Sequence, residues 1–380
     1  MTEKNSTFES GILPLRKNID RIDAQILTLL EKRQIQVEKV VQLKKQHHIP
    51  VWHPAREEDL ISRLRTQAQK VDIDPDFMED LYRVILRQSR DRQAGKIKYK
   101  GILNKGKVLI IGGDGQMGRF FGTLFKKSDY TVRVLGETDW NHAGELCSEI
   151  DLCLVCVPID KTAQVIERIA PFLSPETILS DLTSTKQEPL YAMLQAHPGP
   201  VIGLHPIFGP TSRSLDKQIV VVCPGRKEEK CQWLIDQLSF WNAVIVRASA
   251  EEHDEVMEVV QALRHFATFC FGQFLYEKQI RLERTLEFSS PIYRLELGMV
   301  GRLFAQDARL YSEIIFATPH RRQLLKEYIA SMSRHMELLE TNDKDLFNTK
   351  FKEIAGWFGP FSGQAMREST FLINKLIERF

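Results

Sequence analysis

A glycine-rich segment near residue 113 has the residue types and spacing that point most directly to chemistry. An apolar run over 107–111 leads into Gly113-Asp114-Gly115-Gln116-Met117-Gly118, a G-x-G-x-x-G motif. Such a motif binds the pyrophosphate of a dinucleotide when it joins a strand to a helix. We expect Gly113 to permit the tight turn and Gly115 to let the phosphates approach the backbone. Gly118 would let the helix pack closely on the strand.

The residues around this motif predict how the dinucleotide is held. The backbone amides of Gln116 and Met117, at the start of the predicted helix, should face the pyrophosphate. The next predicted strand ends near Leu135 and is followed by Glu137 and Asp139. An acidic residue about 20 positions after the loop binds ribose hydroxyls and favours NAD over NADP. Either residue could do this, and its distance from the strand favours Glu137. The predicted cofactor is NAD.

A second group of polar residues lies in the first hundred residues, which read as wholly helical. This block holds 20 Lys and Arg against 15 Asp and Glu, a balance that suits an anionic ligand. Arg33 and Lys44 share one helix face with their Cα atoms about 16 Å apart. Arg16 lies roughly 260° around the helix from Arg33 and could reach the same ligand only from another subunit. An ordinary solvated helix surface is the alternative interpretation.

Hydrophobic periodicity predicts the elements that carry these residues. From Leu15 onward, apolar residues recur at helical spacing for about 30 residues, until Pro50 and Pro54 break the pattern. Two further helices are predicted to begin near Arg56 and Phe77. A first helix of this length needs partner helices to cover it, and we expect a second subunit to supply them.

The remainder of the chain divides into an alternating part and a helical part. Strands are predicted at 107–111, 131–135, 152–157, 177–181, 200–204, 218–223 and 243–247, and their alternation with helices favours a parallel α/β sheet. Helices are predicted at 252–275, 281–288, 291–317, 320–340 and 344–378. The chain is therefore predicted to be multidomain, with an all-α domain (1–93), a linker (94–106), an α/β Rossmann domain (107–249) and an all-α C-terminal domain (250–380).

Composition narrows the class of protein. The 380 residues are 43% hydrophobic with a formal charge of +2, so no global field favours nucleic acid or a membrane surface. Cys153 and Cys156 lie three apart in a predicted strand and point to opposite faces, so no metal site is predicted there. The N-terminal residues lack the apolar core of a signal peptide, and no 18-residue apolar stretch occurs. A cytoplasmic location is expected.

Two further segments carry a family resemblance. Residues 203–210, Gly-Leu-His-Pro-Ile-Phe-Gly-Pro, and residues 289–294, Ser-Ser-Pro-Ile-Tyr-Arg, resemble prephenate dehydrogenase. The N-terminal helices resemble the all-helical class of chorismate mutase. The whole chain thus resembles the bifunctional chorismate mutase/prephenate dehydrogenase family of bacterial tyrosine biosynthesis, in that family's domain order. The resemblance implies an all-α mutase domain, a Rossmann NAD-binding domain and an all-α dimerisation domain.

The resemblance implies roles for residues in the dehydrogenase. NAD would accept a hydride from the ring carbon that bears the hydroxyl of prephenate, while the ring carboxylate leaves as carbon dioxide. His205 would accept the hydroxyl proton as general base, with Ser184 orienting it. Lys186 would place a second charge near the site, and Arg294 offers a planar fork suited to a carboxylate. His265 would contact substrate or a feedback-inhibiting tyrosine, with core packing as the alternative.

The resemblance also implies a mutase site that converts chorismate to prephenate in one pericyclic step without a cofactor. Such a site holds the reactive conformer and stabilises charge on the breaking ether bond. Lys44 and Gln93 would lie at the ether oxygen, whereas His53 occupies a position that is acidic in some relatives. The implied assembly is an intertwined homodimer. The full set of mutase positions would be Arg16, Arg33, Lys44, Arg56, Glu57, Ser89 and Gln93.

Two other interpretations stay open. In one, the protein is a dehydrogenase whose N-terminal helices only dimerise it, although Arg16, Arg33, Lys44 and Glu57 would then be unnecessary. In the other, a nucleic-acid-binding module is fused to a sensor domain. Such a module would need a denser basic face and a recognisable nucleic-acid-binding motif. Arogenate as an alternative substrate and inhibition by tyrosine are undecided. We expect prephenate to be released between the two sites, since nothing in the linker suggests a tunnel.

Overall fold

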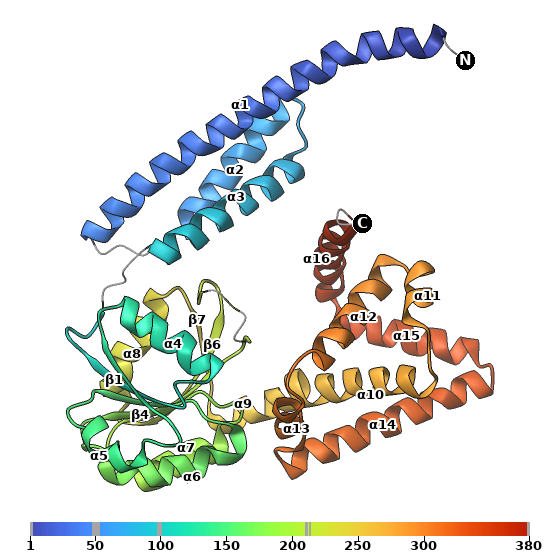
Figure 1. Cartoon of the computed structure of the whole chain (residues 1–380). Coiled ribbons are helices and arrows are strands. Elements are labelled where there is room, and N and C mark those ends of the chain that lie inside the picture. The colour runs from blue at the N-terminus through green and yellow to red at the C-terminus, as the bar shows by residue number, and fades with distance from the viewer. Residues whose placement is uncertain (1–2, 48–53, 97–100, 210–211, 213, 378–380) are drawn as a thin grey trace. The chain divides into compact units, whose positions relative to one another are not determined.

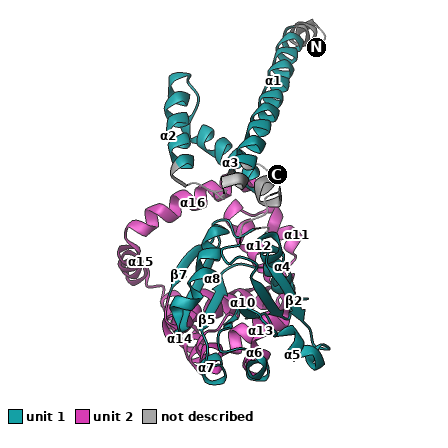
Figure 2. Ribbon diagram, turned by 90° about the vertical axis from the view of Figure 1, so that its left-hand side faces the viewer, with its two compact units in different colours: residues 1–156, 167–182, 193–247 teal, residues 157–166, 183–192, 248–380 magenta. Residues whose placement is uncertain are grey.

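The computed structural model describes the chain except for residues 1–2, 48–53, 97–100, 210–211, 213 and 378–380 (Figure 1). The described residues form two compact units (Figure 2). Unit 1 comprises residues 1–156, 167–182 and 193–247. Unit 2 comprises residues 157–166, 183–192 and 248–380.

Three helices form the N-terminal part of unit 1, as predicted. They are α1 (Glu3–His47), α2 (Pro54–Lys70) and α3 (Pro75–Lys96). Pro54 and Pro75 each open a helix, where the missing amide hydrogen costs no hydrogen bond. The buried Ile61 and Ala68 lie on α2. Because α3 runs to Lys96, the first residues of the predicted linker are helical.

The rest of unit 1 is built on a seven-stranded sheet, in the order β2-β1-β3-β4-β5-β6-β7. The predicted parallel sheet is confirmed for most of its pairs: all neighbouring strands are parallel except β5 and β6, which pair antiparallel. Residues 207–218 connect these two strands, and no helix occurs among the described residues of this connection. The strands are β1 (Lys107–Ile111), β2 (Thr131–Leu135), β3 (Leu152–Val155), β4 (Ile178–Asp181), β5 (Val201–Pro206), β6 (Ile219–Arg226) and β7 (Val244–Arg247).

The core lies where helices cover the sheet. Phe121 and Phe125 of α4 pack with Trp241 and with the buried strand residues Ile110 and Leu154. The ring centroids of Phe125 and Trp241 are 4.9 Å apart, edge to face. The helices that alternate with the strands are α4 (Gln116–Lys127), the short η1 (Trp140–His142) and α5 (Ala143–Leu146), α6 (Ile159–Ile169), η2 (Ala170–Phe172), α7 (Gln187–Ala196) and α8 (Glu228–Phe240).

The chain after Arg247 is helical, and it forms most of unit 2. Two helices predicted as continuous are broken: 291–317 is interrupted at 305–307, and 344–378 at Gly359. Asp307 caps a new helix by accepting from Arg309 N–H, and Gly359 adopts φ +51°. The helices are α9 (Ala250–Met257), the π-helix η3 (Glu258–Leu263), α10 (Arg264–Glu277), α11 (Leu282–Glu287), α12 (Pro291–Phe304), α13 (Ala308–Phe316), α14 (Pro319–Glu340), α15 (Lys344–Phe358) and α16 (Pro360–Ile377).

Candidate active sites

The glycine motif joins β1 to α4 through a compact turn. Gly112 N–H donates to the Leu135 carbonyl at 3.0 Å, and Gly115 N–H donates to the Gly112 carbonyl at 3.0 Å. Gly112 takes a positive φ of +74°, and Gly113 follows it in the same turn. A Cβ on Gly113 would lie 2.7 Å from Val134 Cγ1, so this glycine is needed for space.

The start of α4 has the features of an anion-binding site. A Cβ on Gly118 would lie 2.6 Å from the Gly112 carbonyl, which agrees with the close packing predicted for this residue. Gly115 occupies the N-cap position, and no side chain caps the helix there. The amides of Gln116 and Met117 at this N-terminus suit a pyrophosphate, because they point along the helix dipole toward negative charge. These residues fit the predicted dinucleotide.

The two acidic residues after β2 differ in their environment. Asp139 Oδ2 accepts a hydrogen bond from Gly136 N–H at 2.9 Å, and Asp139 Oδ1 accepts from Thr138 Oγ1 at 3.2 Å. Its carboxylate therefore closes the local turn. Glu137 has an exposed side chain at the same end of the strand. This difference favours Glu137 as the partner of the ribose hydroxyls.

His205 lies near the carboxyl end of β5 and is only 3% exposed. In the neighbouring parallel strand, Asp181 pairs with Gly203, two residues before His205. Ligands of open α/β sheets bind outside the carboxyl ends of the strands, where β1 also delivers the glycine motif. The position of His205 therefore suits a catalytic side chain better than a purely structural one.

Ser184 and Lys186 follow β4 and belong to unit 2. Lys186 is fully buried, and Ser184 is partly exposed. Asp254 of α9 holds this segment: its carboxylate accepts Lys186 N–H at 2.8 Å and Gln187 N–H at 3.0 Å. Burial alone would raise the pKa of Asp254, but hydrogen bonds from His253 and from these two amides outweigh it and lower that pKa. Asp254 was not among the predicted site residues.

Arg294 lies in the first turns of α12. Its Nη2 donates to the Leu286 carbonyl at 2.5 Å, so the guanidinium helps to hold the end of α11. Ser290, from the same sequence motif, caps α12 by accepting from Tyr293 N–H. Arg294 was predicted to bind a carboxylate. The contact with Leu286 shows that its Nη2 already donates a hydrogen bond within the protein.

His265 packs against an aromatic ring in unit 2. Its ring centroid is 4.8 Å from that of Tyr311, edge to face. Burial and the charge of Arg264 lower the pKa of His265 to about 4, so its imidazole is neutral near pH 7. Burial raises the pKa of Tyr311, and the charges of Arg302 and Arg264 oppose that rise. These two arginines beside the aromatic pair were not predicted, because their proximity depends on how α10, α12 and α13 pack.

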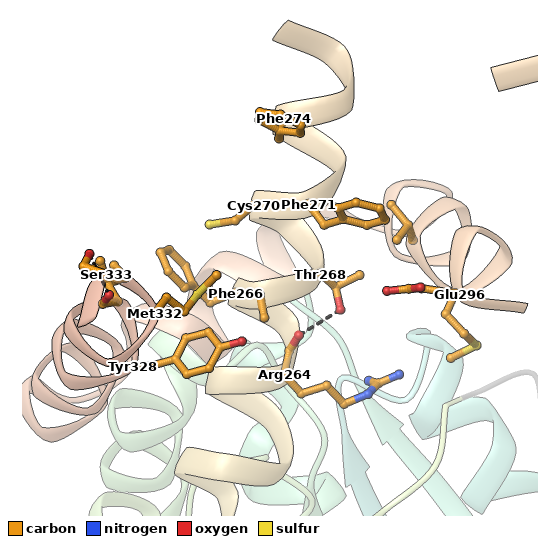
Figure 3. Close-up of a pocket in the computed structure, with 14 residues that line it drawn as sticks. Arg264, Phe266, Thr268, Cys270, Phe271, Phe274, Glu296, Tyr328, Met332 and Ser333 are labelled. Carbon is orange, nitrogen blue, oxygen red and sulfur yellow. Dashed lines mark hydrogen bonds between the residues drawn. The ribbon is translucent and has the colours of Figure 1, made fainter. Parts of the chain in front are cut away.

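The neighbours of His265 in the chain open onto a largely apolar pocket of about 930 Å³ in unit 2 (Figure 3). Arg264 and Phe266 line it from α10, Glu296 from α12, and Tyr328 and Met332 from α14. In the close-up, the Arg264 side chain extends toward the side where Glu296 lies. The pocket combines a broad apolar wall with one acidic and one basic group.

The three N-terminal helices bring some of the predicted mutase residues together. Arg33 Nη1 on α1 donates to Ser89 Oγ on α3 at 2.9 Å, and Ser89 Oγ donates to the Ile85 carbonyl at 2.8 Å. Glu57 is partly buried in the first turn of α2, where the helix dipole stabilises its negative charge. Arg56, next to it, is exposed.

The remaining mutase positions are not all described. Arg16 is exposed on α1, and its role in another subunit stays a prediction. Lys44 and Gln93 lie on α1 and α3, but their side chains fall outside the described residues. His53 also lies outside them. An unpredicted residue, Arg90, donates from Nη1 to both carboxylate oxygens of Glu57 at 2.6 Å.

Cys153 is buried in β3, and Cys156 directly follows that strand. Within the described ranges, no group of three His, Cys, Asp or Glu side chains is arranged to hold a metal ion. No helix in that part of the chain is both long and apolar enough to cross a membrane.

Comparison with known proteins assigns these sites to domains. Residues 15–94 match the type II chorismate mutase family, residues 127–249 the nucleotide-binding domain of prephenate dehydrogenase, and residues 249–353 its dimerization domain. The T-protein of Enterobacter agglomerans is 43% identical over 361 residues, which cover 95% of this chain and 96% of that protein. The chain belongs to the T-protein family. The T-protein of Haemophilus influenzae is 38% identical and covers 97% of this chain and 98% of its own.

T-protein membership confirms the family predicted from the sequence. The chain is a bifunctional chorismate mutase and NAD-dependent prephenate dehydrogenase of tyrosine biosynthesis. The predicted order of helical, Rossmann and helical domains is also confirmed. The nucleotide-binding match, together with the fit of the glycine motif, supports NAD as the cofactor.

Solved structures show the fold of the dehydrogenase part of this T-protein. Prephenate dehydrogenase from Aquifex aeolicus superimposes with a TM-score of 0.53 at 18% identity, covering 67% of this chain and 97% of that one. Arogenate dehydrogenase from Synechocystis superimposes with a TM-score of 0.52 at 16% identity, covering 69% of this chain and 99% of that one. The two substrates are thus handled on one fold, and the fold alone does not distinguish them.

Proposed function

We propose that the mutase activity resides in a site formed by Arg16, Arg33, Lys44, Arg56, Glu57, Ser89 and Gln93. The observation that carries this proposal is the hydrogen bond from Arg33 to Ser89, which joins positions 56 residues apart in the chain. The contact is partly buried between α1 and α3, whereas an ordinary solvated helix surface would leave Arg33 in water. Chorismate is a dianion, so a cluster of arginines with a lysine suits its two carboxylates.

The mutase residues can lower the activation barrier of the chorismate rearrangement by positioning the substrate and by stabilising charge. Cations from more than one helix hold the two carboxylates so that the reacting carbons approach each other. Lys44 and Gln93 donate hydrogen bonds to the ether oxygen, where negative charge develops as the bond breaks. Glu57 is the one acceptor-only side chain in the set, and it suits the ring hydroxyl of the substrate.

The dehydrogenase site combines His205, Ser184, Lys186 and Arg294 with the glycine loop, and Glu137 binds the adenosine ribose. His205 accepts the proton of the substrate hydroxyl, and Ser184 keeps its imidazole oriented. Arg294 binds a carboxylate of prephenate and Lys186 places a second positive charge near the site, which positions the hydroxyl-bearing carbon for hydride loss. NAD supplies the hydride acceptor. Loss of carbon dioxide then yields the aromatic ring of 4-hydroxyphenylpyruvate.

The assembly is a homodimer. Leu27 on α1 is 70% exposed and Trp357 on α15 is 81% exposed, and further apolar side chains follow them on the same helices. Contiguous apolar surface of this kind marks a protein interface. A second copy would cover α1 and deliver its own Arg16 to the mutase site. The dimerization-domain match at 249–353 supports contacts through unit 2 as well.

Four finer assignments complete the proposal. The domain boundaries are 1–93, 94–106, 107–249 and 250–380, and the location is cytoplasmic.

His265 lies beside the substrate or a regulatory tyrosine as a neutral hydrogen-bonding group, in line with its lowered pKa. Prephenate is released by the mutase before the dehydrogenase binds it, which a trapping enzyme that intercepts prephenate would demonstrate.

A paired assay tests the two sites. Purified protein should consume chorismate without cofactor, and should form NADH from NAD and prephenate. Lys44→Ala should abolish mutase turnover while gel filtration still shows a dimer, and His205→Asn should lower the dehydrogenase rate about a thousandfold. Each variant should keep the other activity. NADH formation without chorismate consumption would reduce the N-terminal helices to an assembly role, and a Lys44→Ala protein with full mutase turnover would overturn the role of Lys44.

A further inference from the structure

Arg90 lies between two carboxylates in unit 1. Its Nη1 donates to both oxygens of Glu57 at 2.6 Å, and its Nε donates to Asp216 Oδ2 at 2.8 Å. The side chains of Arg90, Glu57 and Asp216 are 13%, 16% and 18% exposed. Arg90 follows Ser89, which binds Arg33, so this ion cluster adjoins two residues of the proposed mutase site.

The cluster differs from the other ion pairs of the same helices. Arg83 on α3 pairs with Glu58 of α2, but these side chains are 44% and 64% exposed. Exposed ion pairs contribute little to folding stability, because water screens the two charges and both side chains lose conformational freedom when they pair. Around Arg90, water is largely excluded, so charge–charge attraction is screened less. Burial alone would lower the pKa of Arg90, but Glu57 and Asp216 outweigh that effect and raise it.

The substrate explains why Glu57 needs such a partner. A carboxylate next to a dianionic substrate is repelled by it and would turn away if its side chain were free. A guanidinium that binds both of its oxygens offsets part of that repulsion and fixes the carboxylate plane. The remaining acceptor capacity of Glu57 then has a defined direction for the ring hydroxyl.

Asp216 brings a second part of the chain into this arrangement. It lies between β5 and β6, eleven residues after His205 and outside the segment that matches chorismate mutase. Asp216 Oδ2 accepts from Arg90 Nε at 2.8 Å, and Asp216 Oδ1 has no hydrogen-bond partner among the described residues. Asp216 therefore holds the guanidinium from the side opposite Glu57.

We propose that Arg90 is a positioning residue of the mutase site, which fixes Glu57 for the substrate hydroxyl and is itself anchored by Asp216 of the dehydrogenase part. The proposal rests on the mutase site proposed above. It makes a residue of the Rossmann segment contribute to catalysis by the N-terminal helices. The proposal also explains why Arg90 binds two carboxylates, since one partner alone would leave its long side chain free to change rotamer.

The test compares full-length variants in both assays. Arg90→Met removes the guanidinium with little change in length and should lower mutase kcat/KM at least about tenfold, mainly through kcat, because a misplaced acceptor is felt in the transition state. Arg90→Lys keeps the positive charge but not the planar guanidinium, so its mutase kcat should lie between those of Arg90→Met and the wild type. Arg83→Met is the matched control on the same helix and should leave mutase kinetics unchanged. Dehydrogenase turnover of added prephenate should be unchanged in all three variants.

Asp216→Asn tests the anchor separately. It should lower mutase kcat at least about twofold although it lies outside the mutase helices, and its effect should vanish in the Arg90→Met background. Equal mutase kinetics in Arg90→Met and Arg83→Met would overturn the role of Arg90. Unchanged mutase kinetics in Asp216→Asn would overturn the anchor. Wild-type protein without mutase activity would instead refute the proposed function itself.

Discussion

Arg33 on α1 and Ser89 on α3 share a hydrogen bond of 2.9 Å between Nη1 and Oγ. The serine hydroxyl in turn donates to the Ile85 carbonyl one helical turn earlier, so its orientation is set by its own helix. The arginine is therefore held from α3 through its Nη1. A guanidinium that must bind a substrate carboxylate benefits from being placed before the substrate arrives, because less side-chain freedom is then lost on binding.

Ser89→Ala should lower mutase kcat/KM about tenfold, which corresponds to ~1.4 kcal/mol of barrier. The substitution removes the acceptor that holds Arg33 and leaves the helix backbone unchanged. Chorismate disappearance measures the effect. Ser62→Ala, at an exposed position on α2, is the matched control and should behave as wild type. Identical kinetics in the two variants would show that the Arg33–Ser89 contact has no part in turnover.

Gly118→Ala should raise KM for NAD at least about tenfold, with mutase activity unchanged. A Cβ at this position would lie 2.6 Å from the Gly112 carbonyl and 2.7 Å from Gly113 Cα, so the loop or the helix must move. Such a shift misdirects the amides that face the pyrophosphate. NADH formation at varied NAD concentration measures KM.

Gly122→Ala on the same helix is the control for the glycine prediction. Its Cβ would lie 3.4 Å from Ile110 Cδ1, an ordinary contact that the side chain can accommodate. We expect KM for NAD to stay within about twofold of wild type, since surrounding side chains adjust to changes of this size at low cost. An NAD affinity that falls equally in both variants would mean that the glycine spacing is not what holds the cofactor.

The sequence predicted those features that depend on local pattern. Apolar runs such as Leu109-Ile110-Ile111 are fully buried strands, and both the strand positions and the glycine motif were recognised from them. Breaks inside long helices were missed at Gly359 and near Asp307, because one glycine or one capping aspartate does not interrupt apolar periodicity. The antiparallel direction of β6 was missed because strand direction is decided by the connection and not by the strand's own residues.

Pairings between distant residues could not be predicted from the sequence. Glu57 was recognised, but its partner Arg90 lies 33 residues away on another helix, where arginine is also a common surface residue. Likewise, nothing in the sequence around Arg294 indicates that its guanidinium holds the Leu286 carbonyl. Which of many charged residues become partners is decided by how helices pack, and helix packing depends on the whole core.

Asp254 provides a pH-dependent test of how the segment after β4 is held. Its folded-state pKa lies below the ordinary value of 3.8. A carboxylate with a lowered pKa stabilises the fold at all pH values above its unfolded pKa, and this stabilisation is lost as pH falls through the folded pKa. Asp254→Asn should therefore be less stable than wild type at pH 7, by about 1–3 kcal/mol. The difference should shrink only on acidification below about pH 4.

The physical reason lies in the two amides that Asp254 accepts. An asparagine can accept Lys186 N–H with its oxygen, but its amide nitrogen would then face Gln187 N–H, donor against donor. The segment that carries Ser184 and Lys186 loses its anchor, so dehydrogenase kcat should also fall while mutase kinetics stay the same. Denaturant unfolding at pH 7, at pH 5 and at about pH 3 measures the stability difference, and the prephenate assay measures the change in dehydrogenase kcat. Asp160→Asn, whose carboxylate pairs with the exposed Arg309 in the same unit, is the control and should change stability by less than about 1 kcal/mol. A stability difference for Asp254→Asn that stays constant down to pH 4 and below would contradict an ionised carboxylate as the anchor.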